Sequence, residues 1–215
     1  ICHTSGTTGA PKGVRYSHRS NVLHALAASA RDVLGIGSTD TVLPMVPMFH
    51  ANGWGMPYAC LAYGAGLVLP GGRLDGVSLY EVMQTEGVTL ALGVPTICRA
   101  LLEEIDKRGT PPSALKRMAI AGSAAPAEMI RRFSDYGIDV IHAWGMTETS
   151  PIGTAWTVTQ ETAQLPDEAQ TALKSLQGRP VFGVDLRIVD ANGNELCHDG
   201  DASGALQVRG GWVKP

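Results

Sequence analysis

The sequence predicts an α/β fold, in which a mostly parallel sheet with flanking helices is followed by the start of a small antiparallel β subdomain. Before residue 178, short apolar runs alternate with helix-like stretches, which is the pattern of βαβ units. After residue 178, the pattern changes to strands in which apolar and polar residues alternate, with a turn between them. The composition, with 44% hydrophobic and 17% charged residues among 215, is that of an ordinary globular core. We therefore expect an α/β part over 1–177 and a β subdomain over 178–215.

The first elements are expected from apolar runs and helix-capping residues. In order, we expect a strand at 1–4, a helix from Ser17 to Gly35, a strand at 41–46, a helix at 53–63 and a strand at 66–69. Ser17 is a suitable N-cap, and Gly35 is a helix stop. The apolar face expected between them consists of Val22, Leu23, Leu26, Ala27, Ala30, Val33 and Leu34, which recur with a helical period.

The middle of the chain continues the alternation. We expect helices at 78–87, 95–109 and 126–137, strands at 88–92, 117–121 and 138–142, and a polar helix-like connection at 166–178. Ser78 and Glu81 have the spacing of a capping box, and Pro95 suits a first helical position. In parallel sheets ligands collect beyond the carboxyl ends of the strands, so the loops after these strands are the candidates for a site.

The β subdomain is expected from two alternating strands and the turn between them. Residues 184–189 and 206–209 alternate apolar and polar side chains, and Asp190–Gly193 is a turn. Its Asn192-Gly193 pair is a strong hairpin signal.

Charge and cysteine usage exclude several classes of protein. A net charge of −3 and the lack of a basic run do not indicate nucleic-acid binding, and no apolar stretch is long enough to span a membrane. Cys2, Cys60, Cys98 and Cys197 lack the spacing of a zinc site, so we expect buried free thiols in a reducing compartment and a cytoplasmic location. Peripheral membrane contact and a homodimer stay open. The chain has no initial Met and ends without a stop signal, so we expect an internal fragment of a longer polypeptide.

The glycine-rich loop from Thr4 to Val14 predicts a polyphosphate site. It reads TSGTTGAPKGV, so that Ser5, Gly6, Thr7, Thr8 and Gly9 lie between Thr4 and Lys12. Turned backbone N–H groups form an anion site, and Lys12 adds a positive charge. The alternative is a flexible surface loop. Lys12 is followed by Gly13 rather than Ser or Thr, so this is not a P-loop of the Walker A type.

Three further loops carry candidate chemistry. Glu148, in a hydroxyl-rich loop after a strand, is a candidate Mg²⁺ ligand, since Mg²⁺ is usually held by one or two carboxylates plus substrate phosphates. Trp144 offers a flat face for a base, and the small residues of 122–126 allow a planar group to approach. The loop 47–54 contains His50 and Trp54. Each has a structural alternative: a helix-capping Glu148, a structural His50, core tryptophans and a tight strand-to-helix turn at 122–126.

The order of these motifs resembles the acyl-adenylate-forming superfamily of AMP-binding enzymes. The motifs are TSGTTGAPKGV, PMFHANGW, GVPT from Gly93, AGSAAP, AWGMTETSP, GRP from Gly178 and GALQVRG from Gly204. They run through nearly the whole chain, and the first and fifth are highly specific together. PMFHANGW and AGSAAP look most like the fatty-acyl-CoA synthetase branch.

The resemblance implies a ligase that acts in two steps. A fatty acid of medium or long chain attacks the α-phosphate of Mg·ATP to give an acyl-adenylate and pyrophosphate, and CoA then displaces AMP. Residues implied in catalysis are Lys12, Thr147 and Glu148, and those implied on the metal side are Glu148 and Thr4. Residues implied around the nucleotide are Thr4, Ser5, Gly6, Thr7, Thr8, Gly9, Lys12, Gly122, Ser123, Ala124, Ala143, Trp144, Gly145 and Thr147. Residues implied in the acyl pocket are His50, Trp54 and Gly93.

The chain departs from the family pattern in two respects. Many relatives have Tyr where Trp144 stands, which keeps a flat aromatic face and loses a hydroxyl. The ribose-binding aspartate motif, the hinge and the C-terminal lid with its lysine would all lie after Pro215, so we expect the fragment alone to be inactive. The alternatives are another acyl- or aryl-acid adenylating enzyme of the superfamily and a non-catalytic nucleotide-binding relative.

Overall fold

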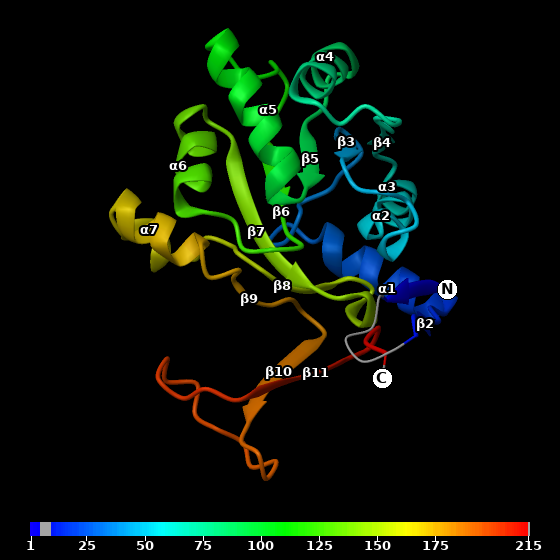
Figure 1. Cartoon of the computed structure of the whole chain (residues 1–215), viewed down its shortest axis with the longest axis vertical. Helices are drawn as coiled ribbons and strands as arrows, with labels where there is room; N and C mark the ends of the chain where they lie inside the picture. The colour runs from blue at the N-terminus through cyan, green and yellow to red at the C-terminus, as the bar shows by residue number, and fades with distance from the viewer. Residues whose placement is uncertain (5–9, 215) are drawn as a thin grey trace.

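The computed structural model describes residues 1–4 and 10–214 of the chain. Figure 1 shows a central sheet with helices on both sides, and a pair of strands, β10 (Val184–Val189) and β11 (Ala205–Gly210), that extends away from it. The predicted fold class, a mostly parallel α/β sheet with flanking helices followed by small antiparallel strands, is confirmed.

The central sheet has seven strands in the order β4-β3-β5-β6-β7-β8-β9. They are β3 (Thr41–Pro44), β4 (Gly66–Leu67), β5 (Leu90–Gly93), β6 (Arg117–Ile120), β7 (Asp139–Gly145), β8 (Ile152–Ala155) and β9 (Arg179–Pro180). Neighbours from β4 to β7 pair in parallel, whereas β8 pairs antiparallel with both β7 and β9. The carboxyl ends of β3, β5, β6 and β7 therefore lie at one edge of the sheet.

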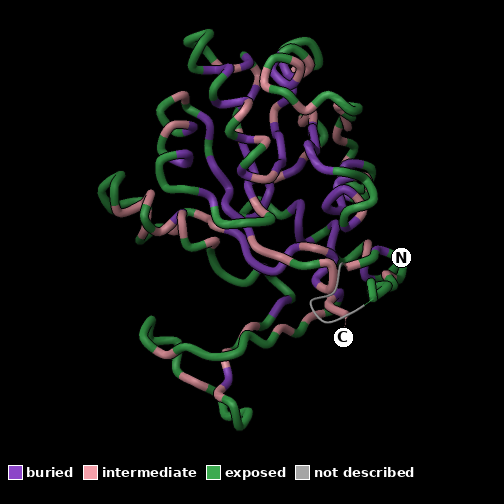
Figure 2. Tube along the Cα trace, in the orientation of Figure 1, coloured by how far each residue is buried: buried purple, intermediate pink, exposed green. Residues whose placement is uncertain are grey.

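Helices cover both faces of the sheet, and each face has its own hydrophobic cluster. One face carries α1 (His18–Ser29), α2 (Ala51–Trp54) and α3 (Met56–Tyr63), and the other carries α4 (Gly76–Glu86), α5 (Pro95–Arg108) and α6 (Ala127–Asp135). Along β6, Ala119 packs into the first cluster, whereas Met118 and Ile120 pack into the second. This alternation buries both sides of the strands. In Figure 2 the strands of the central sheet are accordingly mostly purple, the colour of buried residues. The last helix, α7 (Asp167–Lys174), contacts α6.

The helix α1 buries a different face from the one expected. Ser17 is its N-cap, as predicted, but the helix ends at Ser29, well before Gly35. Of the expected apolar residues, Val22, Leu23 and Leu26 are exposed, whereas Ala27, Val33 and Leu34 are buried as expected. The buried face of the helix itself consists of Ser20, His24, Ala25, Ala27, Ala28 and Ser29. This face is held to the sheet by the hydrogen bond from the Ile152 N–H to His24 Nε2, at 3.2 Å.

Two further helices begin at other residues than expected. The N-cap of α4 is Asp75, whose Oδ1 accepts the Ser78 N–H at 2.9 Å, so the capping box at Ser78 is wrong. Asp75 is itself a preferred capping residue three positions earlier. The helix expected from residue 53 begins at Met56, because Gly55 is left-handed with φ of 76°. As predicted, α4 ends before Gly87, and α5 begins at Pro95 and ends before Gly109.

The segment after His142 differs from the expected loop. β7 continues to Gly145 and pairs with β8, a strand that the alternation does not reveal. The register shifts between Trp144 and Gly145. Such bulges re-aim side chains and are frequent beside active sites.

Two antiparallel pairs lie outside the central sheet. β1 (Cys2–Thr4) pairs with β2 (Lys12–Val14), and β10 (Val184–Val189) pairs with β11 (Ala205–Gly210). The turn at Asn192-Gly193 does not join β10 directly to β11: it returns the chain to Glu195, which bridges Val189, before β11 begins at Ala205. Within the described residues, no helix has the length and apolar character needed to cross a membrane.

Candidate active site

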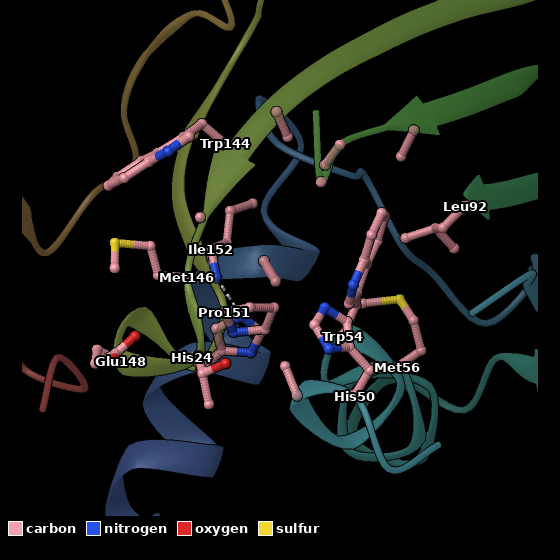
Figure 3. Close-up of a pocket in the computed structure, with 18 of the residues that line it drawn as sticks. His24, His50, Trp54, Met56, Leu92, Trp144, Met146, Glu148, Pro151 and Ile152 are labelled. Atoms are coloured by element: carbon pink, nitrogen blue, oxygen red, sulfur yellow. Dashed lines mark hydrogen bonds between the residues drawn. The ribbon is translucent and has the colours of Figure 1, made fainter. Parts of the chain in front are cut away.

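A cavity of about 470 Å³ opens where the sheet strands end at their carboxyl side. Figure 3 shows part of its wall, with His24, Pro151 and Ile152 on one side and His50, Trp54 and Met56 on the other. Thr4, Lys12, Thr147 and Glu148 supply a polar part of the wall. The apolar part comes from Ala28, Leu34, Met56, Leu92, Ala119, Ala121 and Ile152. The cavity is of the size that binding sites for small molecules have.

Most of the site residues implied by the motifs line this cavity. They are Thr4, Lys12, His50, Trp54, Gly122, Ala143, Trp144, Gly145, Thr147 and Glu148. Ser5, Gly6, Thr7, Thr8 and Gly9 lie outside the described residues.

Three of the implied residues do not line it. Ser123 and Ala124 are exposed in the loop that Gly122 begins. Gly93 ends β5, but a Cβ there would lie 2.7 Å from Met45 Cε and 3.3 Å from Cys98 Sγ. Met45 and Cys98 belong to the cluster under α4–α6, so Gly93 faces the other side of the sheet.

The β1–β2 pair brings both described ends of the glycine-rich loop together. Thr4 is the register partner of Lys12, and both line the cavity. Thr4 and Lys12, which carry a hydroxyl and an ammonium group, therefore lie next to each other at the cavity wall. Both donate hydrogen bonds, as recognition of phosphate oxygens requires.

The turn that carries Thr147 and Glu148 is held by its own hydrogen bonds. It is the 3₁₀ turn η1 (Thr147–Thr149). The buried Thr149 hydroxyl accepts the Met146 N–H at 2.8 Å, and the Met146 N–H also donates to Pro151 O at 3.1 Å. These bonds connect the end of β7 to the start of β8 and thereby fix the position of the turn that carries Glu148.

The close contact between Gly145 and Pro151 leads to a prediction about stability. An added Cβ at Gly145 would lie 1.7 Å from Pro151 O and 2.7 Å from its carbonyl carbon. Because both atoms are backbone, no rotamer change relieves the clash. We expect Gly145→Ala to lower the free energy of unfolding by about 1–3 kcal/mol.

The measurement is the urea midpoint of the purified chain. A matched control is Gly72→Ala, where an added Cβ meets no atom within 4 Å. A Gly145→Ala midpoint equal to that of the control would contradict the prediction.

Trp144 lies on β7 with its ring against the neighbouring strand. A Cβ at Gly153 would come within 2.6 Å of Trp144 Cζ3 and 2.8 Å of its Cε3. Gly153 therefore supplies the flat surface on which the indole rests, and Trp144 stays half-buried at the cavity wall. Gly153 belongs to no motif and is missed by sequence reasoning, because the strand that contains it is not expected.

The short helical segment α2 (Ala51–Trp54) has an unusual backbone. Ala51, Asn52, Gly53 and Trp54 all have φ between 45° and 59°, a region that non-glycine residues rarely adopt. Left-handed residues of this kind cluster at functional sites. Here they bring Trp54 to the cavity, with Trp54 Cζ2 3.8 Å from where a Gly122 Cβ would lie. The loops 47–54 and 122–126 thus meet at the site.

Two buried histidines have no counterpart in the sequence motifs. His24 lines the cavity, and its Nε2 accepts the Ile152 N–H at 3.2 Å. Burial lowers the pKa of His24 to about 4, so it is neutral at pH 7. Its burial could have been predicted from the helical spacing, because His24 lies four residues after Ser20 and four before Ala28, on the small-residue face of α1.

His142 fixes the loop that follows β6. Its Nε2 accepts the Ala125 N–H at 3.1 Å, and its Nδ1–H donates to Lys174 O at 2.9 Å. Burial lowers its pKa, which favours the neutral ring that this pair of hydrogen bonds requires. The loop 122–126 is therefore tied both to β7 and to the end of α7.

The side chains of the cavity suit Mg²⁺ only in company with a phosphate ligand. The residues in 1–4 and 10–214 contain no group of three or more His, Cys, Asp or Glu side chains that could hold a metal ion. The cavity offers the Glu148 carboxylate with the Thr4 and Thr147 hydroxyls nearby on its wall. One carboxylate is what Mg²⁺ uses when phosphates and water complete its shell.

Comparison with known proteins supports the motif assignment. Residues 1–215 match the family model described as AMP-binding enzyme. The chain is 54% identical over 214 residues to a 3-methylmercaptopropionyl-CoA ligase of Ruegeria lacuscaerulensis. This match covers 99% of the chain and 40% of the relative. It is 50% identical over 214 residues to a medium-chain-fatty-acid-CoA ligase of Ectopseudomonas oleovorans. That match covers 99% of the chain and 39% of the relative.

A solved structure shares the fold. O-succinylbenzoate coenzyme A synthetase (MenE) from Bacillus subtilis, in complex with ATP and magnesium ion, matches with a TM-score of 0.81 and 26% identity. The match covers 99% of the chain and 41% of that structure. The chain thus spans about 40% of the length of these relatives.

Proposed function

The chain belongs to the AMP-binding enzyme family, and from this membership we propose that the protein that contains it is an AMP-forming acyl-CoA ligase. It would activate a carboxylic acid with ATP and transfer the acyl group to CoA. The curated relatives at 54% and 50% identity are both named as CoA ligases.

One observation carries the proposal. A single cavity gathers the glycine-loop residues Thr4 and Lys12, the aromatic Trp144 and the pair Thr147 and Glu148. These residues come from two segments about 130 positions apart. Each type matches one need of adenylation, namely phosphate charge, base stacking and a metal-side carboxylate, and the apolar part of the same cavity suits a hydrocarbon chain.

The chemistry assigned to the site needs no general base. A carboxylate oxygen forms a bond to the α-phosphorus of ATP, and the bond to the pyrophosphate oxygen breaks. The acid is already ionised near neutral pH. Lys12, Thr4 and Thr147 donate to the phosphate oxygens on which negative charge develops. Magnesium, when bound beside Glu148, neutralises part of that charge. In the second step the CoA sulfur bonds to the acyl carbon, AMP leaves, and the thiol proton passes to solvent.

The substrate we propose is an aliphatic acid of medium or long chain. Part of the cavity wall is apolar, with Leu34, Met56 and Leu92 among its residues. Burial of each methylene contributes about 0.8 kcal/mol, so two extra methylenes that fit raise kcat/KM by up to roughly 15-fold. The relatives' names span a short thioether acid and medium-chain acids, which makes chain length the quantity to measure. The alternatives are another acyl or aryl acid and a non-catalytic nucleotide-binding relative.

The proposal is tested by ATP–pyrophosphate exchange with the full-length protein. The acids to compare are 3-methylmercaptopropionate, hexanoate, octanoate, palmitate and benzoate, each followed by a CoA thioester assay. We expect exchange with the aliphatic acids, which rises with chain length until the cavity is filled. Exchange with benzoate alone would overturn the fatty-acid assignment, and ATP binding without exchange for any acid would favour a non-catalytic module.

The proposal includes a cytoplasmic location. Cys2, Cys60, Cys98 and Cys197 are all free thiols, which agrees with a reducing compartment. The first three are buried, whereas Cys197 is exposed, so the expectation of burial was wrong for that cysteine.

A further inference from the structure

The turn that carries Glu148 receives a hydrogen bond from a tyrosine far away in the sequence. Tyr16 Oη donates to the main-chain oxygen of Thr147 at 2.6 Å, across 131 residues. The Ser150 N–H donates to the same oxygen at 3.2 Å. A carbonyl oxygen has two lone pairs, so both acceptor positions of Thr147 O are used.

Tyr16 lies on the connection that also carries the phosphate-loop lysine. Lys12 begins β2 (Lys12–Val14), Tyr16 follows two residues after its end, and Ser17 caps α1. The capping bonds of Ser17, with Ser20 N at 3.1 Å and Ser20 Oγ at 2.9 Å, fix the chain directly after Tyr16. A short segment anchored at both ends therefore presents Lys12 to the cavity and Tyr16 to the turn.

The environment of Tyr16 keeps its hydroxyl protonated. Burial is the main cause that raises its pKa, and the neighbouring Cys2 and Glu148 act in the same direction. A protonated hydroxyl is a donor, which the Thr147 carbonyl requires.

The opposite side of the turn is held by the main chain near the end of the described residues. The Lys214 N–H donates to Glu148 O at 2.8 Å, and Ser150 Oγ donates to Trp212 O at 3.0 Å. Trp212 is buried, and its Nε1–H donates to Ile152 O at 3.2 Å. With this side fixed to the chain after β11, Tyr16 is the side chain that joins the turn to the β2–α1 connection.

We propose that Tyr16 is a positioning residue that sets where the Thr147–Glu148 turn lies relative to Lys12. This role rests on the proposed function, because the two sides it connects are the metal side and the phosphate side of the polyphosphate site. Loss of the hydroxyl leaves one lone pair of Thr147 O without its donor and lets the turn shift. Small displacements of groups that position a substrate have large effects on rate.

The test compares Tyr16→Phe with wild type in the full-length protein. We expect the Mg²⁺ concentration for half-maximal ATP–pyrophosphate exchange to rise, and kcat/KM for ATP to fall about 3- to 10-fold, as for the loss of one hydrogen bond. We also expect faster amide hydrogen exchange in peptides that span 146–152, with unchanged exchange in β6. Tyr63→Phe is the matched control, since this half-buried tyrosine lies at the end of α3 and lines neither the cavity nor the turn.

The outcomes separate this role from a general structural one. Faster exchange at 146–152 together with a raised Mg²⁺ requirement supports the proposal. Unchanged exchange there, or an equal increase throughout the protein, overturns it. If wild-type protein activates no acid, the proposed function fails, whereas local amide exchange in Tyr16→Phe still decides whether Tyr16 holds the turn.

Discussion

Replacement of Glu148 by Gln in the full-length protein is expected to lower the rate of acyl-adenylate formation by about 10²–10³-fold, the loss typical when one group that stabilises transition-state charge is removed. Gln has nearly the same shape as Glu, so the turn η1 and its main-chain bonds to Pro151 and Lys214 stay in place. What disappears is the negative charge at the cavity wall. A neutral amide oxygen is a weaker Mg²⁺ ligand than a carboxylate, so the metal would bind the enzyme–ATP complex less tightly.

The measurement is ATP–pyrophosphate exchange over a range of Mg²⁺ concentrations. We expect the loss in Glu148→Gln to be partly recovered at high Mg²⁺, because the deficit is one of metal binding. Glu168→Gln, at an exposed position in the first turn of α7, is a control of equal chemical change and should behave as wild type. An unchanged rate and Mg²⁺ dependence in Glu148→Gln would remove Glu148 from the site.

The parts of the fold that follow from local sequence were predictable. Strands such as Leu90–Gly93 are short apolar runs bounded by turn residues, and their burial on both faces of a parallel sheet is what such runs indicate. Helix ends at Gly87 and Gly109 follow from the left-handed backbone that glycine adopts. The rule that ligands bind at the carboxyl ends of parallel strands pointed to loops that line the cavity.

The parts that were missed depend on contacts between distant residues. Burial of His24 in place of Val22, Leu23 and Leu26 requires the Ile152 N–H, 128 residues away. β8 becomes a strand because it pairs with the extension of β7, and not through any apolar alternation of its own. Gly93 was expected in the acyl pocket because of its place in a motif. The pleat of β5 instead turns it toward Met45 and Cys98, on the other face of the sheet.

His24 leads to the second large expected effect, a loss of stability in acid. Its pKa is lowered from 6.5 to about 4 by burial. Between these values the unfolded chain binds a proton that the folded chain does not, so the free energy of unfolding rises with pH in this window. The stabilisation is fully present above pH 6.5 and is lost as the pH falls toward 4, by about 3 kcal/mol in total. The pKa of His142 is lowered by the same cause, so it adds to the loss with the same sign.

The experiment compares wild type with His24→Gln in urea unfolding at a series of pH values from 4 to 8. A Gln Oε1 can still accept the Ile152 N–H but does not titrate, so we expect this variant to lose less stability between pH 6.5 and 4. Above pH 6.5 the two proteins should have parallel pH dependence, which serves as an internal control. NMR titration of the imidazole Cε1 protons should contain one resonance, absent in the variant, that shifts only near pH 4. The prediction would be contradicted if the resonance that is absent in His24→Gln titrated near pH 6.5 in the wild type.

Protonation of His24 also bears on the candidate site. The Ile152 N–H needs an acceptor, and an imidazolium has none to offer. Ile152 begins β8, and its carbonyl oxygen accepts the Trp212 Nε1–H. Loss of the His24 bond would therefore loosen the same strand end that, through Pro151 and Met146, fixes the Glu148 turn. We expect activity in acid to fall together with the His24 titration in wild type, and to persist to lower pH in His24→Gln.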